Sequence, residues 1–245
     1  MTSAERSVRV LASPAALDEL EIQDHLVVVV DVLRACTAIA HALDAGARSV
    51  IPVETVEEAT ELAGRLGRSS AVLAGERRSL RIDGFDLGNS PGEFVPARVG
   101  QKTVVLTTSN GTRTFKRASK AKECVAGAIV NRSAVVRRAG RFERTTIVCA
   151  GDSGGFSYED FLGAGLLVEA IVREASGPIR LHDGARAARE VAAGIADLPG
   201  ALRGTDHGRE LEALGFGEDL GLAASLDRFE RVPALRDGGL TAEEP

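Results

Sequence analysis

The stretch Leu26-Val27-Val28-Val29-Val30-Asp31 decides the fold class of this chain. A short, wholly apolar and valine-rich run is typical of a strand that is buried on both faces in a parallel sheet. The acidic side chain of Asp31 ends the run. We therefore expect a parallel strand over Leu26–Val30, with Asp31 at its carboxyl end.

The same pattern recurs along the first 150 residues. Four further apolar runs end in polar residues and lead towards a helix: 49–53, 71–74, 103–106 and 146–150. The sequence Thr55-Val56-Glu57-Glu58 is a capping box that opens a helix reaching about residue 66. Helices are also expected near 112–120, 132–139 and 158–175. Strands that alternate with helices predict an α/β fold with a mostly parallel sheet.

The segment 177–217 is richer in Ala, Arg and Gly than the sequence before it. Helices are expected at 184–197 and 203–214, the second ending at Gly215 in the usual C-terminal glycine position. We interpret 1–245 as a single domain with a helical flank at 177–217. The last ten residues are expected to be frayed.

The charge balance and the cysteines limit the possible partners. The chain has 35 acidic and 30 basic residues, a net charge of −5 and no basic stripe, so nucleic acid is not an expected partner. Neither a signal peptide nor an apolar run of about 18 residues is present, so we expect a cytoplasmic protein with no membrane partner. Three cysteines without C-x-x-C spacing disfavour a disulfide framework and a zinc site.

Polar residues at strand ends indicate where the site lies. In open α/β sheets, ligands bind beyond the carboxyl ends of the strands. By that rule one edge of the sheet gathers Asp31, Glu54, Glu76, Thr107, Thr108 and Asp152. Each alone could be a helix cap or a solvated loop residue, but five strand ends together favour a shared site.

Three loops could hold an anionic ligand. The loop 107–113, Thr-Thr-Ser-Asn-Gly-Thr-Arg, combines hydroxyls, a helix start and a guanidinium, which suit an oxyanion. A glycine-rich turn at 151–157 could hold phosphate or metal, but it lacks the Lys-Ser or Lys-Thr ending of a P-loop. The loop 84–91 is a shaped turn from which Asn89 and Ser90 could donate to a ligand. The expected contacts of the first loop are Thr107, Thr108, Asn110, Gly111, Thr112 and Arg113.

Residue spacing excludes several phosphatase chemistries. Cys36 has Ala42 six residues later, so the C-x5-R loop of cysteine phosphatases is absent. Asp31 has Leu33 two residues later, so the D-x-D start of haloacid-dehalogenase-type phosphatases is absent. Only 4 histidines are present, which disfavours a histidine-rich dinuclear site. Oxygen ligands and magnesium remain.

An ordered set of segments resembles one known family. The segments are DVLRACTAI (31–39), IPVETVEEA (51–59), LAGER (73–77), GFDLGNSP (84–91), LTTSNGTR (106–113), VCAG (148–151) and HGRELEALGF (207–216). Together they resemble the 2-phosphosulfolactate phosphatases, over about 8–233. The resemblance implies a three-layer α/β/α fold and magnesium-dependent hydrolysis of 2-phosphosulfolactate to 3-sulfolactate and phosphate. In some organisms that step leads towards coenzyme M.

The leading interpretation is a phosphomonoesterase in which Mg²⁺ bridges carboxylates and the phosphoryl group. The expected metal ligands are Asp31, Glu76 and Asp160, with Asp152 and Glu54 as alternatives. The nucleophile is water, Asp31 or Cys36. Water is favoured because Cys36 lacks a C-x5-R cradle and Asp31 lacks a second aspartate.

Arginine suits recognition of the three anionic groups on such a substrate. Arg34, Arg77 and Arg113 each follow a strand end and are expected to line the pocket, although one or more could pair with Glu76 or Asp86 instead. Two other functions stay open, a phosphatase for another small phospho-acid and a non-catalytic protein that binds a sulfonate or phosphate metabolite. A homodimer is expected, because the apolar stretch 220–226 could pack against its own chain or a second one.

Overall fold

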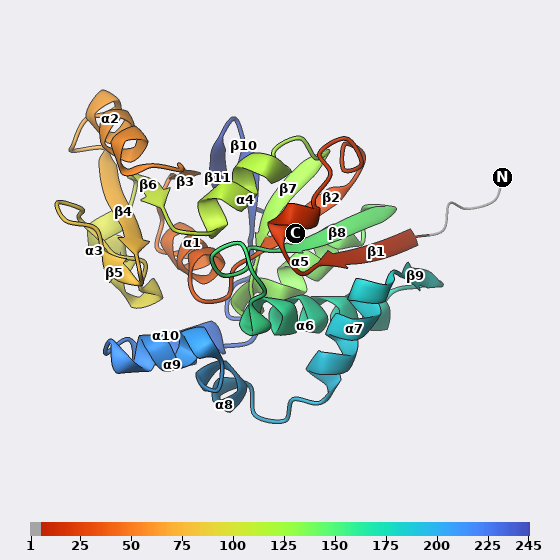
Figure 1. Ribbon diagram of the computed structural model, residues 1–245. Helices are drawn as coiled ribbons and strands as arrows, with labels where there is room; N and C mark the ends of the chain where they lie inside the picture. Colours follow the sequence, from red (N-terminus) through yellow and green to blue (C-terminus); the bar gives the residue numbers. More distant parts are fainter. Residues whose placement is uncertain (1–5) are drawn as a thin grey trace.

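A computed structural model describes residues 6–245 (Figure 1). Its strands form an 11-stranded sheet in the order β5-β4-β6-β3-β11-β10-β7-β2-β8-β1-β9. The strands are β1 (Arg6–Leu11), β2 (Leu26–Val30), β3 (Ser49–Pro52), β4 (Ala71–Arg77), β5 (Leu80–Arg81), β6 (Thr103–Thr107), β7 (Glu123–Gly127), β8 (Arg144–Cys149), β9 (Ile179–Leu181), β10 (Val232–Arg236) and β11 (Gly239–Glu243).

Helices α1 to α7 alternate with strands along the chain, and α8, α9 and α10 follow α7 with no strand between them (Figure 1). They are α1 (Ala35–Asp44), α2 (Val56–Leu66), α3 (Pro96–Val99), α4 (Gly111–Ala118), α5 (Arg132–Ala139), α6 (Tyr158–Glu174), α7 (Asp183–Ala193), α8 (Leu198–Arg203), α9 (Asp206–Ala213) and α10 (Gly217–Ala223). Short 3-10 helices lie at Pro14–Ala16, Pro91–Glu93 and Ile129–Asn131. Within residues 6–245, no helix is long and apolar enough to cross a membrane.

Strand β2 shows why the fold has three layers. Successive side chains of a strand point to opposite faces of the sheet. Val28 and Val30 pack in a core with residues of α5, α6 and α7, whereas Val27 and Val29 pack in a second core with residues of α1 and α4. All five residues of β2 are fully buried between the parallel neighbours β7 and β8. The predicted α/β class and the three-layer α/β/α arrangement are confirmed.

The sheet is mostly parallel but contains two sets of strands. The set β9-β1-β8-β2-β7 is parallel throughout, and so is the set β3-β6-β4. The hairpin β10-β11 lies between them and pairs antiparallel with both β7 and β3. Three successive antiparallel pairings reverse direction, so the two parallel sets run in opposite directions through the sheet. The sequence pattern did not predict this reversal.

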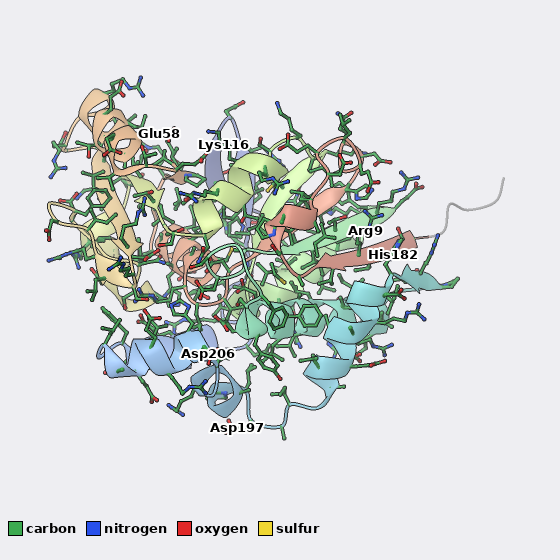
Figure 2. All side chains as sticks on the ribbon, viewed as in Figure 1. Arg9, Glu58, Lys116, His182, Asp197 and Asp206 are labelled. Carbon is green, nitrogen blue, oxygen red and sulfur yellow. The ribbon has the colours of Figure 1, made fainter. Side chains whose placement is uncertain are left out.

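Two helix ends that the sequence predicted from local residue patterns are present in the structure. The Thr55 hydroxyl accepts a hydrogen bond from the Glu58 N–H at 3.0 Å, so the predicted cap of α2 is present. Glu58 lies in the first turn of that helix (Figure 2). Gly215 has φ +86°, the left-handed conformation expected after a helix. The helix expected at 203–214 is present as α9 but begins at Asp206, because α8 ends at Arg203 and the Thr205 hydroxyl caps α9.

The expectation that the last ten residues are frayed is wrong. Gly239–Glu243 forms β11, which pairs with β10 and touches β3 in the middle of the sheet. Leu240 is fully buried there, so burial of apolar surface holds the end of the chain in place.

The apolar stretch 220–226 packs partly against its own chain. Leu220 and Ala223 of α10 are fully buried in the core that contains α6, while Leu226 is 48% exposed. The α10 part of this stretch therefore packs against its own chain, which is one of the two alternatives expected from the sequence. The homodimer stays a prediction.

Candidate active site

A cavity of about 330 Å³ lies where polar strand ends meet the C-terminal helices. Both parallel sets of strands contribute to it, despite their opposite directions. Strand ends and α9 supply much of its lining: Asp31 after β2, Glu76 at the end of β4, Thr108, Ser109 and Asn110 after β6, Asp152 and Ser153 after β8, and His207 and Glu210 on α9. The remaining lining residues are Leu33, Arg34, Arg78, Ser79 and Asn89.

The predicted site residues divide into those that line the cavity and those that do not. Asp31, Arg34, Glu76, Asn89, Thr108 and Asn110 are in the lining. Outside it lie Cys36, Arg77, Ser90, Thr107, Gly111, Thr112, Arg113 and Asp160. Glu54 is also outside, and its carboxylate pairs with Lys116 at 2.6 Å.

Asp31 is a buried carboxylate held at the cavity wall. Its Oδ1 accepts a hydrogen bond from the Ala35 N–H at 2.9 Å, at the start of α1. A Cβ atom at Gly111 would lie 2.6 Å from Oδ2, so glycine at this position leaves room for that oxygen. Burial raises the pKa of Asp31 to about 6; the Ala35 N–H and His207 oppose the rise, and the charges of Glu76 and Glu159 add to it. The carboxylate would therefore gain from a cation nearby.

Glu76 ties the β4–β5 hairpin to the loop after β6. Its Oε1 accepts a hydrogen bond from the Ser109 N–H at 2.7 Å. Its Oε2 accepts from the Ser79 N–H at 3.0 Å and from the Ser109 hydroxyl at 3.3 Å. The carboxylate is thus fixed in orientation while it faces the cavity.

Asp160 lies behind the cavity rather than in its lining. Its Oδ1 accepts from the Val32 N–H at 2.8 Å and its Oδ2 from the Gly151 N–H at 3.0 Å. Burial raises the pKa of Asp160, and the charges of Asp31 and Glu159 add to this. Asp160 therefore joins the loops after β2 and β8 that carry Asp31 and Asp152.

The carboxylates of the cavity suit a magnesium ion that is held by few protein ligands. Within residues 6–245, no group of three or more His, Cys, Asp or Glu side chains is arranged to hold a metal ion. Mg²⁺ is commonly bound by one or two carboxylates, with water and substrate phosphate completing its coordination. Asp31 and Glu76 supply two carboxylates at one cavity. These two residues fit magnesium of that kind.

Arg34 is the predicted arginine that reaches the lining. Its Nη1 lies 3.0 Å from Asp219 Oδ2, and its Nη2 donates to the Ser79 carbonyl at 2.6 Å. Its guanidinium lies over the Phe216 ring, 4.7 Å from the ring centre. Arg34 Nε and Asn89 Oδ1 are buried and have no hydrogen-bond partner among residues 6–245.

The expectation that Arg77 and Arg113 line the cavity is corrected by their placement. Arg77 donates to Thr107 Oγ1 at 3.0 Å and to two backbone carbonyls, and it is not part of the cavity lining. Arg113 is exposed on α4. Arg78 lines the cavity instead. The reason is that β4 continues to Arg77, so the hairpin turn falls on Arg78 and Ser79, which have φ +52° and +65°.

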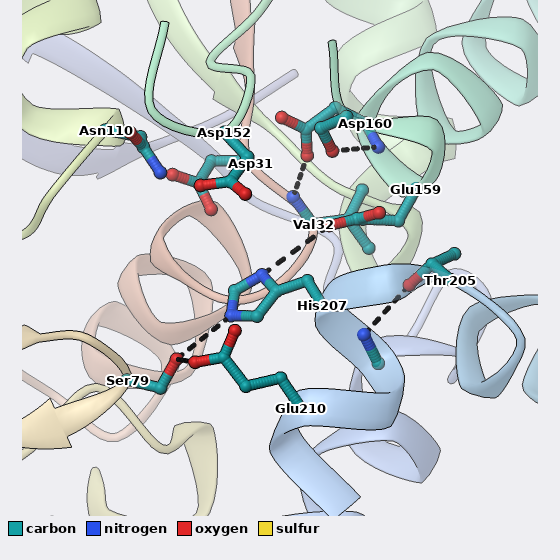
Figure 3. A network of polar contacts seen from close by, with 12 residues as sticks. Asp31, Val32, Ser79, Asn110, Asp152, Glu159, Asp160, Thr205, His207 and Glu210 are labelled. Atoms are coloured by element: carbon teal, nitrogen blue, oxygen red, sulfur yellow. Dashed lines mark hydrogen bonds and ion pairs between the residues drawn. The ribbon is translucent and has the colours of Figure 1, made fainter. Parts of the chain in front are cut away.

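His207 is a central cavity residue that the strand-end rule did not predict (Figure 3). Its Nδ1 lies 3.5 Å from Glu159 Oε1, and its Nε2 lies 3.3 Å from the Ser79 hydroxyl. Burial alone would lower the pKa of His207, but the hydrogen bond and charge of Glu159 outweigh burial and raise it. The charge of protonated His207 in turn opposes the rise in the pKa of Asp31.

Comparison with known proteins now identifies the family. A family model described as 2-phosphosulpholactate phosphatase matches residues 11–238. The chain belongs to the 2-phosphosulfolactate phosphatase family. A protein of Caldanaerobacter subterraneus subsp. tengcongensis named probable 2-phosphosulfolactate phosphatase is 40% identical over 228 residues, which is 91% of this chain and 92% of that protein.

Two further relatives carry the same name. The Clostridium beijerinckii protein is 33% identical over 237 residues, covering 96% of this chain and 99% of the relative. The Thermotoga maritima protein is 38% identical over 218 residues, covering 89% of this chain and 92% of the relative. The resemblance found in the sequence is confirmed, and it extends to the segment that contains His207.

Cys36 of this phosphatase-family chain lies in the hydrophobic core behind Asp31. Its Sγ donates to the Val29 carbonyl at 3.2 Å, and the residue is 1% exposed. Burial raises the pKa of the Cys36 thiol, and the charges of Asp31 and Asp160 raise it further. The thiolate that a covalent mechanism needs is therefore disfavoured.

The strand-end rule overlooked the side chains that complete the cavity, Arg78, Ser79, His207 and Glu210. They come from a hairpin turn and from helix α9, neither of which is a strand end. One sequence feature pointed to α9, the segment HGRELEALGF at 207–216. This segment resembles the 2-phosphosulfolactate phosphatases, but the resemblance did not indicate a role for its histidine.

Proposed function

We propose that this chain is a magnesium-dependent phosphatase that hydrolyses 2-phosphosulfolactate to 3-sulfolactate and phosphate. The observation that carries the proposal is one cavity that joins two carboxylates, Asp31 and Glu76, to the polar loop at 108–110. The names of the relatives support this substrate.

Charge explains why a cation belongs in this reaction. The substrate carries a carboxylate, a sulfonate and a phosphate, about four negative charges at neutral pH. The acidic residues of the lining are Asp31, Glu76, Asp152 and Glu210. Of the two lining arginines, Arg34 is already paired with Asp219. The lining carboxylates outnumber the cationic groups Arg34, Arg78 and His207, so an additional cation would favour binding of this substrate.

The residues of the chain have distinct roles in the proposed reaction. Asp31 and Glu76 would hold Mg²⁺, which supplies neutralisation of the charge on the phosphoryl oxygens. Thr108 and Asn110 bind and orient the phosphoryl group through a hydroxyl and an amide donor, while Ser109 donates its N–H and its hydroxyl to Glu76 and so holds that carboxylate. A water molecule is the nucleophile, in line with the burial of the Cys36 thiol.

Phosphate release from a panel of substrates tests this function. The panel consists of 2-phosphosulfolactate, 2-phospholactate and 2-phosphoglycerate, each with the protein and Mg²⁺. We expect the highest kcat/KM for 2-phosphosulfolactate. A higher value for another member would assign the chain to a different phospho-acid, and tight binding of all three without turnover would indicate a binding protein.

We also propose that the protein works in the cytoplasm as a homodimer. Light scattering tests the oligomeric state. A mass near 25.6 kDa at micromolar concentration would contradict the dimer.

A further inference from the structure

We propose that His207 is the general acid that protonates the leaving oxygen of the substrate through its Nε2. The inference rests on the proposed function, because it requires hydrolysis of an alkyl phosphate. It adds a role for the C-terminal helices, which the strand-end rule did not include in the site.

The position of His207 is fixed by the local packing of α9. The Thr205 hydroxyl accepts a hydrogen bond from the Gly208 N–H at 2.9 Å and so caps the first turn of α9, the turn that contains His207. A Cβ atom at Gly208 would lie 2.0 Å from the Leu202 carbonyl oxygen, so this glycine permits close contact between α8 and α9. The imidazole consequently projects into the cavity that Asp31 and Asp152 also line (Figure 3).

The hydrogen-bond partners of His207 indicate that both ring nitrogens carry protons. The Ser79 hydroxyl donates its single proton to Glu210 Oε1 at 2.9 Å. It can therefore only accept from His207 Nε2, which lies 3.3 Å away. Nδ1 faces the Glu159 carboxylate, which is also an acceptor, at 3.5 Å. Two acceptors around one imidazole favour the imidazolium form.

The charged surroundings of His207 support the same conclusion. Carboxylates face it from three elements: Glu159 of α6, Asp31 at the end of β2 and Glu210 of α9 itself. Arg34 and Arg78 are the arginines in the same lining. Burial lowers the pKa of His207, whereas the hydrogen bond and the charge of Glu159 raise it. Together with the two acceptors around the ring, Ser79 Oγ and Glu159 Oε1, this favours a proton at Nε2.

The step balances without a further reactant. The oxygen of water forms a bond to phosphorus while the bond between phosphorus and the substrate's C2 oxygen breaks, and the electron pair stays on that C2 oxygen. His207 Nε2 gives this oxygen its proton, so 3-sulfolactate leaves as an alcohol. The water's two protons remain on the product as H₂PO₄⁻, which returns one proton to the neutral imidazole. General acid catalysis of this kind contributes about 10²- to 10⁴-fold.

The decisive experiment compares two leaving groups in His207→Gln. The alkoxide of 2-phosphosulfolactate needs a proton, whereas p-nitrophenolate from p-nitrophenyl phosphate is a stable anion. We expect kcat to fall about 10²- to 10⁴-fold for 2-phosphosulfolactate and less than about tenfold for p-nitrophenyl phosphate. Equal losses on both substrates would mean that His207 only supports the structure and would overturn the proposal.

Two further variants serve as a control and as a second test. His182→Gln should leave both activities unchanged, because His182 lies beside Arg9 on the side of the molecule that contains β1 and β9 (Figure 2). Glu159→Gln removes the main acceptor from Nδ1, so the alkaline limb of the kcat/KM pH profile should move to lower pH. An unmoved limb in folded Glu159→Gln would overturn the proposal even if His207→Gln failed to fold.

The outcome for wild-type protein separates this inference from the proposed function. If the wild type releases phosphate from 2-phosphoglycerate but not from 2-phosphosulfolactate, the proposed substrate is wrong and the leaving-group comparison is made with 2-phosphoglycerate. If it cleaves p-nitrophenyl phosphate but no alkyl phosphate, the role of His207 is wrong.

Discussion

Arg34 and Asp219 form a buried ion pair, with Nη1 3.0 Å from Oδ2 and side chains that are 2% and 3% exposed. Their positions in the sequence are 185 residues apart. The second oxygen of Asp219 accepts from the Ser90 hydroxyl. The pair thus connects the loop after β2, the loop at 84–91 and helix α10, and it fixes the guanidinium at the cavity.

Removing one member of this pair should destabilise the protein strongly. Asp219→Ala leaves the Arg34 charge buried without its partner, so we expect a loss of about 3–5 kcal/mol in the free energy of unfolding by urea denaturation. Glu212→Ala is the control, because its pair with Arg203 is 51% and 42% exposed and should contribute less than about 1 kcal/mol. A loss for Asp219→Ala as small as that of the control would show that the buried pair is dispensable.

Gly111→Ala tests the space beside Asp31. The new Cβ would lie 2.6 Å from Oδ2 and 2.9 Å from the Ala35 Cβ, so the carboxylate or helix α4 must shift. A misplacement of about 1 Å can cost about 100-fold, and we expect a loss of that order in kcat. Gly64→Ala in α2 is the matched control, because nothing lies within 4 Å of its Cβ position. Similar activity in both variants would contradict the proposed position of Asp31.

Cys36→Ser should retain activity within about threefold, because the thiol is buried and its pKa is raised by burial. The serine hydroxyl can still donate to the Val29 carbonyl, the partner of the present thiol. Steady-state kinetics on 2-phosphosulfolactate measure the effect. A loss beyond about a thousandfold, about 4 kcal/mol in activation free energy, would instead indicate covalent cysteine chemistry.

The raised pKa of Asp31 predicts a pH-dependent stability. Burial raises this pKa from 3.8 to about 6, so the folded state binds the proton more tightly than the unfolded state. The stability that this proton provides is complete below about pH 4 and is lost as pH rises through about 6. The asparagine side chain of Asp31→Asn does not ionise, so this variant does not lose stability as the pH rises. Its free energy of unfolding relative to that of wild type should therefore increase to about 2–3 kcal/mol at pH 7.5 in metal-free buffer. Urea unfolding at pH 4 and pH 7.5 gives the comparison, and an advantage independent of pH would contradict the shift.

The sequence predicted the parts of the site that depend on strand ends. Asp31, Glu76 and Thr108 follow apolar runs whose burial is set by local composition, and all three line the cavity. The direction of the strands was beyond this pattern, because the reversal between the two parallel sets depends on the late hairpin β10-β11. That hairpin is short and its pairings are non-local.

The direction in which a side chain points could not be predicted from the sequence, and this accounts for the site residues that were misplaced or missed. Arg113 follows the Asn-Gly turn in sequence, but α4 begins at Gly111, and helical rotation places Arg113 on the exposed side. His207 lies on a helix with no neighbouring strand end, and its partners Ser79 and Glu159 are distant in sequence. Such contacts follow from tertiary packing and are not encoded in a local pattern.

Metal removal tests the central claim most directly. Purified protein is treated with EDTA and dialysed, and phosphate release from 2-phosphosulfolactate is measured before and after Mg²⁺ is added, with Asp31→Asn alongside. The account predicts little release without metal, recovery with Mg²⁺ in the wild type and no recovery in Asp31→Asn. Release that is equally fast in the EDTA-treated and Mg²⁺-loaded wild type would contradict it.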